Sequence, residues 1–148
     1  MTEKKTKTKV GKTRNWSKNR SILKSIKNPS KESYEIKMKI PELTFEGCRG
    51  QPDFAHLYIT FYPSDKVIEL KSLKEYFFAF RSQIYSYERI INVIYDDMMV
   101  SYEPARLRLA MVCNPRGGIS SKLTVDSDWG VRGGKDRFKD WVGQQEEW

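Results

Sequence analysis

Two neighbouring stretches with helical periodicity lie in the middle of the chain, and alternating apolar and polar residues flank them on both sides. The first stretch places apolar residues at the i, i+3, i+4 and i+7 positions of one helix face, namely Leu73, Tyr76, Phe77 and Phe80. The second spans residues 87–102, with Asp96 expected on its outer face, and Pro104 ends it. An order of strands, two helices and strands predicts an α+β fold whose helices cover one face of an antiparallel sheet.

Alternation with a period of two predicts the strands of this sheet, at residues 34–40, 56–62, 66–70, 106–113 and 119–125. Residues 41–53 contain two prolines and two glycines and are predicted to form a loop. The turn at residues 63–65 predicts that the strand at 66–70 pairs antiparallel with the preceding strand. The other sheet face is predicted to be polar, which favours copies that assemble around a shared wet interior.

The corner between the third strand and the first helix combines a capping signature with basic residues. Ser72 and Glu75 form a capping box, which predicts that the helix starts just after Lys71. Free N–H groups at a helix start attract anions, and Lys71 and Lys74 add positive charge beside them. The corner is therefore a candidate phosphate site, although lysines that merely flank a surface helix would give the same pattern.

Two further positions can recognise polar groups of a ligand. Arg116 can grip a phosphate with two N–H groups, and Gly117 lets the backbone approach it closely, although the same residues suit an ordinary hairpin turn. Glu88, at the start of the second helix, can accept two N–H groups from a purine-like or pterin-like ring. A carboxylate at a helix start is also favourable for the helix itself, so both interpretations remain open.

The predicted loop carries a possible nucleophile and possible proton donors. Cys48 is next to Arg49, which would favour the thiolate, and either Asp53 or Glu46 can act as the proton donor. Cys48 can equally be a loop residue without chemistry. The only other cysteine, Cys113, lies on an apolar strand face and is predicted to be in the core. One histidine and two distant cysteines favour neither a disulfide framework nor a metal site.

The net charge of +8 is confined to the start of the chain. Residues 1–33 contain 11 Lys and Arg against 2 Asp and Glu, which leaves the remaining residues with a charge of −1. This polar segment is predicted to be a flexible extension with a short docking piece near residues 16–26, and it is either simply solvated or recruits a polyanion such as RNA. A domain is predicted over residues 34–128, followed by a C-terminal extension over residues 129–148.

No run of about eighteen apolar residues and no secretory signal occur, so we expect a cytoplasmic protein that does not enter a membrane.

Four features stand out along the chain, namely GQPDFA at residues 50–55, ELKSLKEYFFAFR at residues 69–81, Glu88, and PRGGIS at residues 115–120. Together they resemble QueF, the family of short NADPH-dependent 7-cyano-7-deazaguanine reductases. The resemblance covers about residues 41–120 in consistent order. It implies the tunnelling fold (T-fold), in which subunits assemble as stacked rings with active sites between them.

The resemblance also implies a mechanism. A cysteine thiolate adds to the nitrile carbon to give a thioimidate, an aspartate donates a proton, and two hydrides from NADPH yield the aminomethyl product, a queuosine precursor. Asp53 matches the family aspartate. The positions implied to contact the substrate are Ile68, Glu69, Leu70, Tyr87 and Glu88. Those implied to contact NADPH are Lys71, Ser72, Lys74, Arg116 and Gly117.

Two positions depart from the family pattern. The family cysteine lies seven residues before the aspartate, where this chain has Glu46, whereas Cys48 lies five residues before Asp53. A family histidine next to the ring-binding glutamate is replaced by Tyr87. The candidate catalytic residues are therefore Cys48, Asp53 and Glu46.

The leading hypothesis is an oligomeric QueF-like reductase that uses NADPH on a 7-deazaguanine nitrile. An alternative is a T-fold enzyme that acts on a pterin or purine-like ring by acid–base chemistry at Glu46. A third hypothesis is an RNA- or nucleotide-binding protein that uses the basic N-terminal arm.

Overall fold

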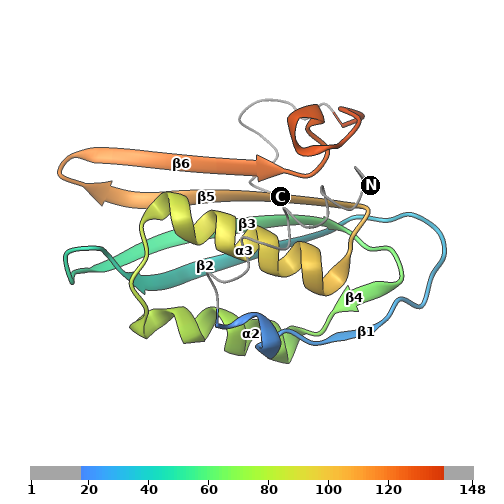
Figure 1. Cartoon of the computed structure of the whole chain (residues 1–148), viewed down its shortest axis with the longest axis horizontal. Coiled ribbons are helices and arrows are strands. Elements are labelled where there is room, and N and C mark those ends of the chain that lie inside the picture. The colour runs from blue at the N-terminus through green and yellow to red at the C-terminus, as the bar shows by residue number, and fades with distance from the viewer. Residues whose placement is uncertain (1–17, 139–148) are drawn as a thin grey trace, which may run out of the picture.

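A computed structural model describes residues 18–138, in which two helices cover one face of a four-stranded antiparallel sheet (Figure 1). The strands are β2 (Ile36–Glu46), β3 (Pro52–Tyr62), β5 (Arg106–Arg116) and β6 (Ile119–Asp126), in the spatial order β2-β3-β5-β6. The helices are α2 (Leu70–Ala79) and α3 (Tyr87–Tyr102), joined through the short helix η3 (Phe80–Ser82). The predicted α+β architecture is confirmed.

The core lies between the sheet and the two helices. The four apolar residues predicted to form the buried stripe of the first helix are all buried, and α3 has the predicted bounds. The prediction that Asp96 lies on an outer face is wrong, because Asp96 is 7% exposed. Strands β5 and β6 contact one side of α3, and β4 (Lys66–Ile68) and η2 (Arg20–Ile22) contact it elsewhere, so much of the helix surface is buried.

Strand β2 extends through half of the region predicted to be a loop. It continues past Pro41 to Glu46, and β3 begins at Pro52, so the connection between them is only residues 47–51. Pro41 is tolerated because β2 is an edge strand whose register shifts between Ile40 and Leu43. The two strands therefore form a long hairpin rather than two short strands around a loop.

Strand β4 does not pair with β3, which corrects the prediction for residues 66–70. Both edges of β3 are occupied, by β2 and by β5, so β3 has no free ladder for a third neighbour. Strand β4 pairs instead with β1 (Ser25–Lys27), which belongs to the basic N-terminal segment, and the pair forms a separate two-stranded sheet.

The described part of the N-terminal segment packs onto the domain. Leu23 is buried, and the Arg20 Nε donates to Asp97 Oδ1 at 2.8 Å. Asp97 is fully buried and also accepts a hydrogen bond from the Tyr76 hydroxyl at 2.7 Å. These contacts hold the segment against both helices. The domain boundary at residue 33 stays a prediction, and residues 1–17 lie outside the described range.

The sheet face turned away from the helices is polar. Where β3 ends and β5 begins, Phe138 covers this face. The Arg106 guanidinium donates two hydrogen bonds to Asp126, both side chains being buried. Phe138, which follows η4 (Gly130–Arg132), packs on Tyr62 with 4.8 Å between ring centroids and lies over Arg106. Residues 139–148, which include two of the C-terminal tryptophans, lie outside the described range.

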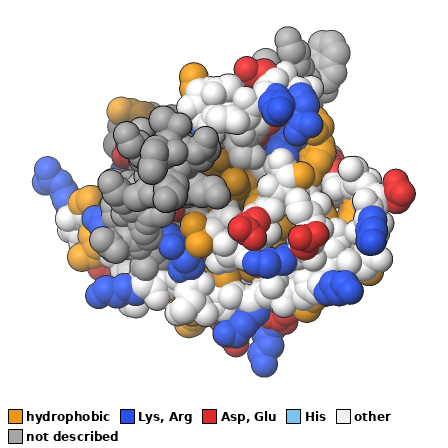
Figure 2. All heavy atoms as spheres, turned by 45° about the vertical axis from the view of Figure 1, so that its right-hand side comes forward, with side chains coloured by type: hydrophobic (Ala, Val, Ile, Leu, Met, Phe, Trp, Pro, Cys, Tyr) orange, Lys and Arg blue, Asp and Glu red, His pale blue; other side chains and the backbone are white. Residues whose placement is uncertain are grey.

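On the molecular face drawn in Figure 2, acidic and basic side chains are interspersed, in keeping with the nearly neutral charge of residues 34–148. No helix among residues 18–138 is long and apolar enough to cross a membrane.

Candidate active site

A cluster of charged and polar side chains lies where the β2–β3 hairpin, the start of α3 and the end of β5 meet, at the left of Figure 1. Its centre is Asp53, which is only 5% exposed. The Arg116 guanidinium donates one hydrogen bond to Asp53 Oδ1 and another, at 3.2 Å, to Gln51 Oε1. The Tyr87 hydroxyl donates to the same Asp53 oxygen at 3.4 Å. Three predicted site residues are thus brought together, and Gln51 is a fourth that the sequence did not indicate.

Local backbone features position this cluster. The hairpin closes through hydrogen bonds from Gly47 N to Gln51 O at 2.6 Å and from Gly50 N to Gly47 O at 2.9 Å. On the other side of the site, the β5–β6 register shifts just before Arg116, and Gly117 follows with φ +58°, a conformation that glycine adopts without strain. The two hairpin turns therefore bring Asp53 and Arg116 together from strands that are remote in the sequence.

The side chains of Glu46 and Asp53 leave the sheet on opposite faces. Phe45 is paired with Asp53, so these two residues share the face that the helices cover, and Glu46 points to the other face. Gly47 is the hairpin position that faces Asp53: a Cβ atom there would lie 2.5 Å from Asp53 Oδ2 and 3.0 Å from Arg116 Nη1. Cys48 follows at the turn and is exposed.

Cys113 lies behind the cluster. It is paired with Ala55, two residues from Asp53 on the same sheet face, and it is buried as predicted. Burial raises the pKa of the Cys113 thiol to about 11, and the negative charges of Asp53 and Glu88 add to the effect. Cys113 is therefore a neutral thiol next to the site rather than a ready nucleophile.

The start of α3 adds two predicted residues. The Ser86 hydroxyl caps the helix by accepting from Arg89 N at 3.1 Å, and Glu88 is exposed in the first turn. Burial, followed by the nearby charge of Asp53, raises the pKa of Tyr87, which therefore stays protonated and remains a hydrogen-bond donor.

The second group of predicted residues lies at the start of α2. The prediction of a capping box was wrong, because Glu69 is the N-cap and its carboxylate accepts from the backbone N–H groups of Ser72 and Lys71. These bonds, that of Ser72 first, lower the pKa of Glu69. The buried Ser72 hydroxyl donates to Glu69 O and accepts from Lys24 N. Both of these hydrogen bonds are to backbone atoms of the same chain, so the hydroxyl supports the helix start.

The exposed residues of this group are the ones that a ligand can reach. Lys71 and Lys74 are exposed, and Leu70 is 62% exposed, whereas Ile68 is buried in the core. A helix of ten residues is about 15 Å long, and the β2–β3 hairpin lies on the side where α2 ends rather than where it starts (Figure 1). Backbone hydrogen bonds join Glu46 of this hairpin to Gln83 and Tyr85, which follow α2 and η3. One copy of the chain therefore does not bring the two groups together.

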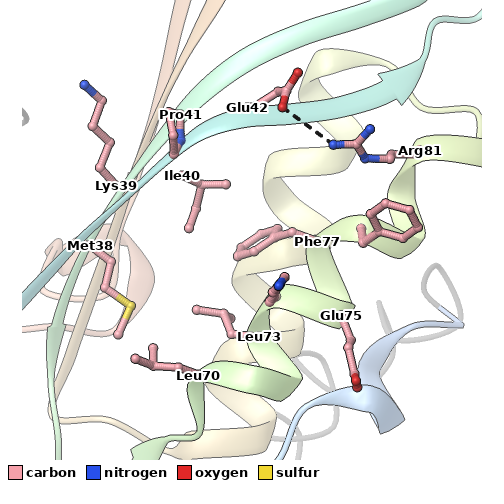
Figure 3. Close-up of a pocket in the computed structure, with 12 residues that line it drawn as sticks. Met38, Lys39, Ile40, Pro41, Glu42, Leu70, Leu73, Glu75, Phe77 and Arg81 are labelled. Atoms are coloured by element: carbon pink, nitrogen blue, oxygen red, sulfur yellow. Dashed lines mark ion pairs between the residues drawn. The ribbon is translucent and has the colours of Figure 1, made fainter.

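An apolar groove of about 580 Å³ runs between α2 and the edge strand β2. Figure 3 shows Ile40, Leu73 and Phe77 between the strand and the helix, with an ion pair between Arg81 and Glu42 at one end. Leu70 and Phe78 also line the groove, and Phe78 is 65% exposed. The groove thus continues the apolar surface of α2 to the free edge of the sheet.

Among residues 18–138, no group of three or more His, Cys, Asp and Glu side chains is arranged to hold a metal ion. The groups suited to an anionic cofactor are instead the cations already described, Lys71, Lys74 and Arg116.

Comparisons with known proteins agree with this architecture. Residues 52–132 match the family model described as QueF-like protein. The chain is 40% identical over 109 residues to the NADPH-dependent 7-cyano-7-deazaguanine reductase of Magnetococcus marinus, a match that covers 72% of this chain and 85% of that protein. A reductase of the same name from Prochlorococcus marinus is 43% identical over 105 residues, covering 68% and 75% of the two chains.

The crystal structure of the archaeosine synthase QueF-Like in the apo form shares the fold, with a TM-score of 0.54 and 10% sequence identity. The match covers 66% of this chain and 94% of that one. A four-stranded antiparallel sheet with two helices on one face, matched to this structure, defines a protein of the tunnelling-fold class. The chain belongs to the QueF-like family, which confirms the resemblance of its motifs.

Proposed function

We propose that this protein is an NADPH-dependent reductase that converts the nitrile of 7-cyano-7-deazaguanine to an aminomethyl group, in the queuosine pathway of tRNA modification. The observation that carries the proposal is the identity of about 40% to reductases of that name. The family match over residues 52–132 includes Asp53, Tyr87 and Arg116. The buried carboxylate next to the hairpin that carries Cys48 supports it.

The chemistry assigns one role to each residue of the cluster. The Cys48 sulfur adds to the nitrile carbon, and Asp53 passes the proton lost by the thiol to the nitrile nitrogen, which gives a neutral thioimidate. Glu88 accepts N–H groups of the ring and orients it, and the Tyr87 hydroxyl holds Asp53 in place. Two hydride additions and two protons then complete the amine and release the thiol.

NADPH supplies these two hydrides when it is bound. The side chains suited to its phosphates are Lys71 and Lys74 at the start of α2 and Arg116 at the end of β5, with the backbone of Gly117 beside it. The buried Ser72 hydroxyl supports the helix start that presents the two lysines.

We further propose a homo-oligomer in which each site takes the Asp53 group from one subunit and the α2 start from another. The length of α2 separates the two groups within one chain. Among residues 18–138, β6 pairs only with β5, and β2 pairs beyond the sheet at its last residue, where Glu46 exchanges backbone hydrogen bonds with Gln83 and Tyr85. The apolar groove flanks the earlier part of β2. A second copy that covers the edge and the groove would remove an exposed ladder and an exposed apolar surface together.

Intact-mass measurement after mixing the protein with 7-cyano-7-deazaguanine tests the enzyme proposal. We expect one covalent adduct in the wild type and in Cys113→Ser, and none in Cys48→Ser. NADPH oxidation by the wild type should follow the same dependence. Absence of the adduct together with absence of NADPH oxidation would exclude the reductase.

The rival based on Glu46 draws no support from the geometry, because the Glu46 side chain leaves the sheet on the face opposite to Asp53. It would require that Glu46→Gln abolishes turnover of a pterin while Cys48→Ala does not. RNA binding by residues 1–33 and a cytoplasmic location stay predictions of the sequence.

A further inference from the structure

We propose that Arg116 is a latch: it pairs with Asp53 until a phosphate group of the dinucleotide draws it away, and its departure frees Asp53 for proton transfer. The inference rests on the proposed function and adds to it a coupling between cofactor binding and the catalytic carboxylate. Arg116 is then a positioning residue for the chemical step as well as a phosphate ligand.

The ion pair is accessible from one side only. The Asp53 side chain is 6% exposed, whereas that of Arg116 is 38% exposed. A phosphate arriving from solvent can therefore contact the guanidinium while the carboxylate stays covered. Arginine binds phosphate through two parallel N–H groups, so a phosphate can replace the Asp53 and Gln51 contacts with an arrangement of equal hydrogen-bonding capacity.

The guanidinium also blocks the approach from the hairpin to Asp53. Position 47 faces the carboxylate, and a Cβ placed there would be 3.0 Å from Arg116 Nη1 and 2.5 Å from Asp53 Oδ2. The space between Gly47 and Asp53 is thus filled by the ion pair. A ring whose nitrile must lie between Cys48 and Asp53 needs that space, which becomes available when Arg116 moves.

The proton transfer has the same requirement. Asp53 must take the proton released by the Cys48 thiol and give it to the nitrile nitrogen, so no proton is gained or lost overall. While the Arg116 guanidinium donates to Asp53 Oδ1, it occupies a carboxylate oxygen that must exchange this proton. Transfer of Arg116 to a phosphate removes that donor from the carboxylate at the step that needs it.

The backbone next to Arg116 permits the movement. Arg116 is the last residue of β5, and the turn that follows consists of Gly117 and Gly118, with φ +58° and +81°. Neither glycine would contact a neighbouring atom if it carried a Cβ, so the turn is not packed against the domain. The arginine can change partner without disturbing the core.

Calorimetric titration of the full-length protein with NADPH tests the latch through binding rather than turnover. Because Asp53 competes with phosphate for Arg116, Asp53→Asn should tighten NADPH binding by roughly fivefold or more, as expected for loss of an ion pair whose arginine is partly exposed and whose carboxylate is buried. Arg116→Gln should weaken binding by roughly tenfold. In the Arg116→Gln background, Asp53→Asn should have no effect. Lys135→Gln, which removes one exposed positive charge elsewhere, is the matched control and should leave the affinity unchanged.

Unchanged or weaker NADPH binding by Asp53→Asn would overturn the latch, as would an equal effect of Asp53→Asn in both backgrounds. Circular dichroism should first establish that the variants are folded. If the wild type forms the Cys48 adduct and binds NADPH but Asp53→Asn does not bind more tightly, only the latch is wrong. If the wild type neither forms the adduct nor binds NADPH, the latch and the proposed function both fail.

Discussion

Replacement of Gly47 by alanine should damage the site and the stability of the hairpin together. The added Cβ would lie 2.5 Å from Asp53 Oδ2, whereas Cβ contacts essentially never fall below 3.0 Å, so the carboxylate must move by at least about 0.5 Å. Asp53 is buried and held by Arg116 and Tyr87, and the backbone oxygen of Gln51 at 3.1 Å limits movement of the alanine itself.

Overpacking of this kind costs about 1–3 kcal/mol of unfolding free energy. For a chain of this size that corresponds to a fall in Tm of roughly 2–4 °C for each kcal/mol. Urea denaturation of Gly47→Ala measures the cost directly. In an Asp53→Ala background the clashing oxygen is absent, so the same substitution should cost less than half as much.

The matched control is Gly50→Ala in the same turn. Gly50 has φ +81° and no atom within 4 Å of an added Cβ, so alanine strains the backbone there without touching Asp53. It should lower stability equally in the wild-type and Asp53→Ala backgrounds. The reasoning is refuted if Gly47→Ala also costs the same in both backgrounds, because the clash with the carboxylate would then not be the cause.

Four further outcomes follow from the structure. Tyr76→Phe removes the buried hydrogen bond to Asp97 and should lower the unfolding free energy by about 1–3 kcal/mol in urea denaturation, against no change for Tyr34→Phe at the surface. Iodoacetamide at pH 8 should label the exposed Cys48 much faster than Cys113 by peptide mass spectrometry, since Cys113 is buried and burial raises the pKa of its thiol to about 11; comparable rates would show that Cys113 is open to solvent. Because the helix cap lowers the pKa of Glu69, its carboxylate stabilises the fold above the ordinary glutamate pKa, and this stability is lost as the pH falls through the lowered pKa. The unfolding free energy of Glu69→Gln, measured against pH in the acid range, should therefore lack this decrease. A pH profile equal to that of the wild type would contradict the cap. Phe78→Asp should reduce the molar mass measured by light scattering, whereas Val131→Asp should not, and an unchanged mass for Phe78→Asp would remove the groove from the proposed subunit contact.

Periodicity predicted the elements well where one face is buried. The bounds of α3 at residues 87–102 and the buried stripe of α2 are as predicted, because their apolar spacing reflects a single packing surface. The partner of β4 could not be predicted in this way, since it depends on the fact that β3 already has two neighbours. Asp96 was misplaced for a related reason: α3 is covered by elements from both ends of the chain.

The chemistry of single residues indicated candidates for the site, but it did not indicate which side chains they contact. Asp53, Tyr87 and Arg116 were assigned different roles from separate motifs, and the structure shows that their side chains are in contact. Glu69 was expected at a strand end, whereas its carboxylate caps α2, because a side chain that accepts two backbone N–H groups can replace a serine cap. The approach of Cys113 to Asp53 follows only from the register of β3 and β5, which no local pattern reveals.

The direction of each side chain in the β2–β3 hairpin depends on its position relative to the paired strands. Phe45 is opposite Asp53, so the next residue, Glu46, points away from the carboxylate. Glu46 nevertheless occupies the position, seven residues before the aspartate, at which the family has its cysteine. Position 47 faces the carboxylate, and a glycine there leaves the space that the Arg116 guanidinium occupies. Any larger residue would collide with the Asp53–Arg116 pair in its present position. The glycine and the ion pair therefore depend on each other. In the proposed mechanism the nucleophile is Cys48 in the turn, which reaches a nitrile beside Asp53 only after Arg116 has moved.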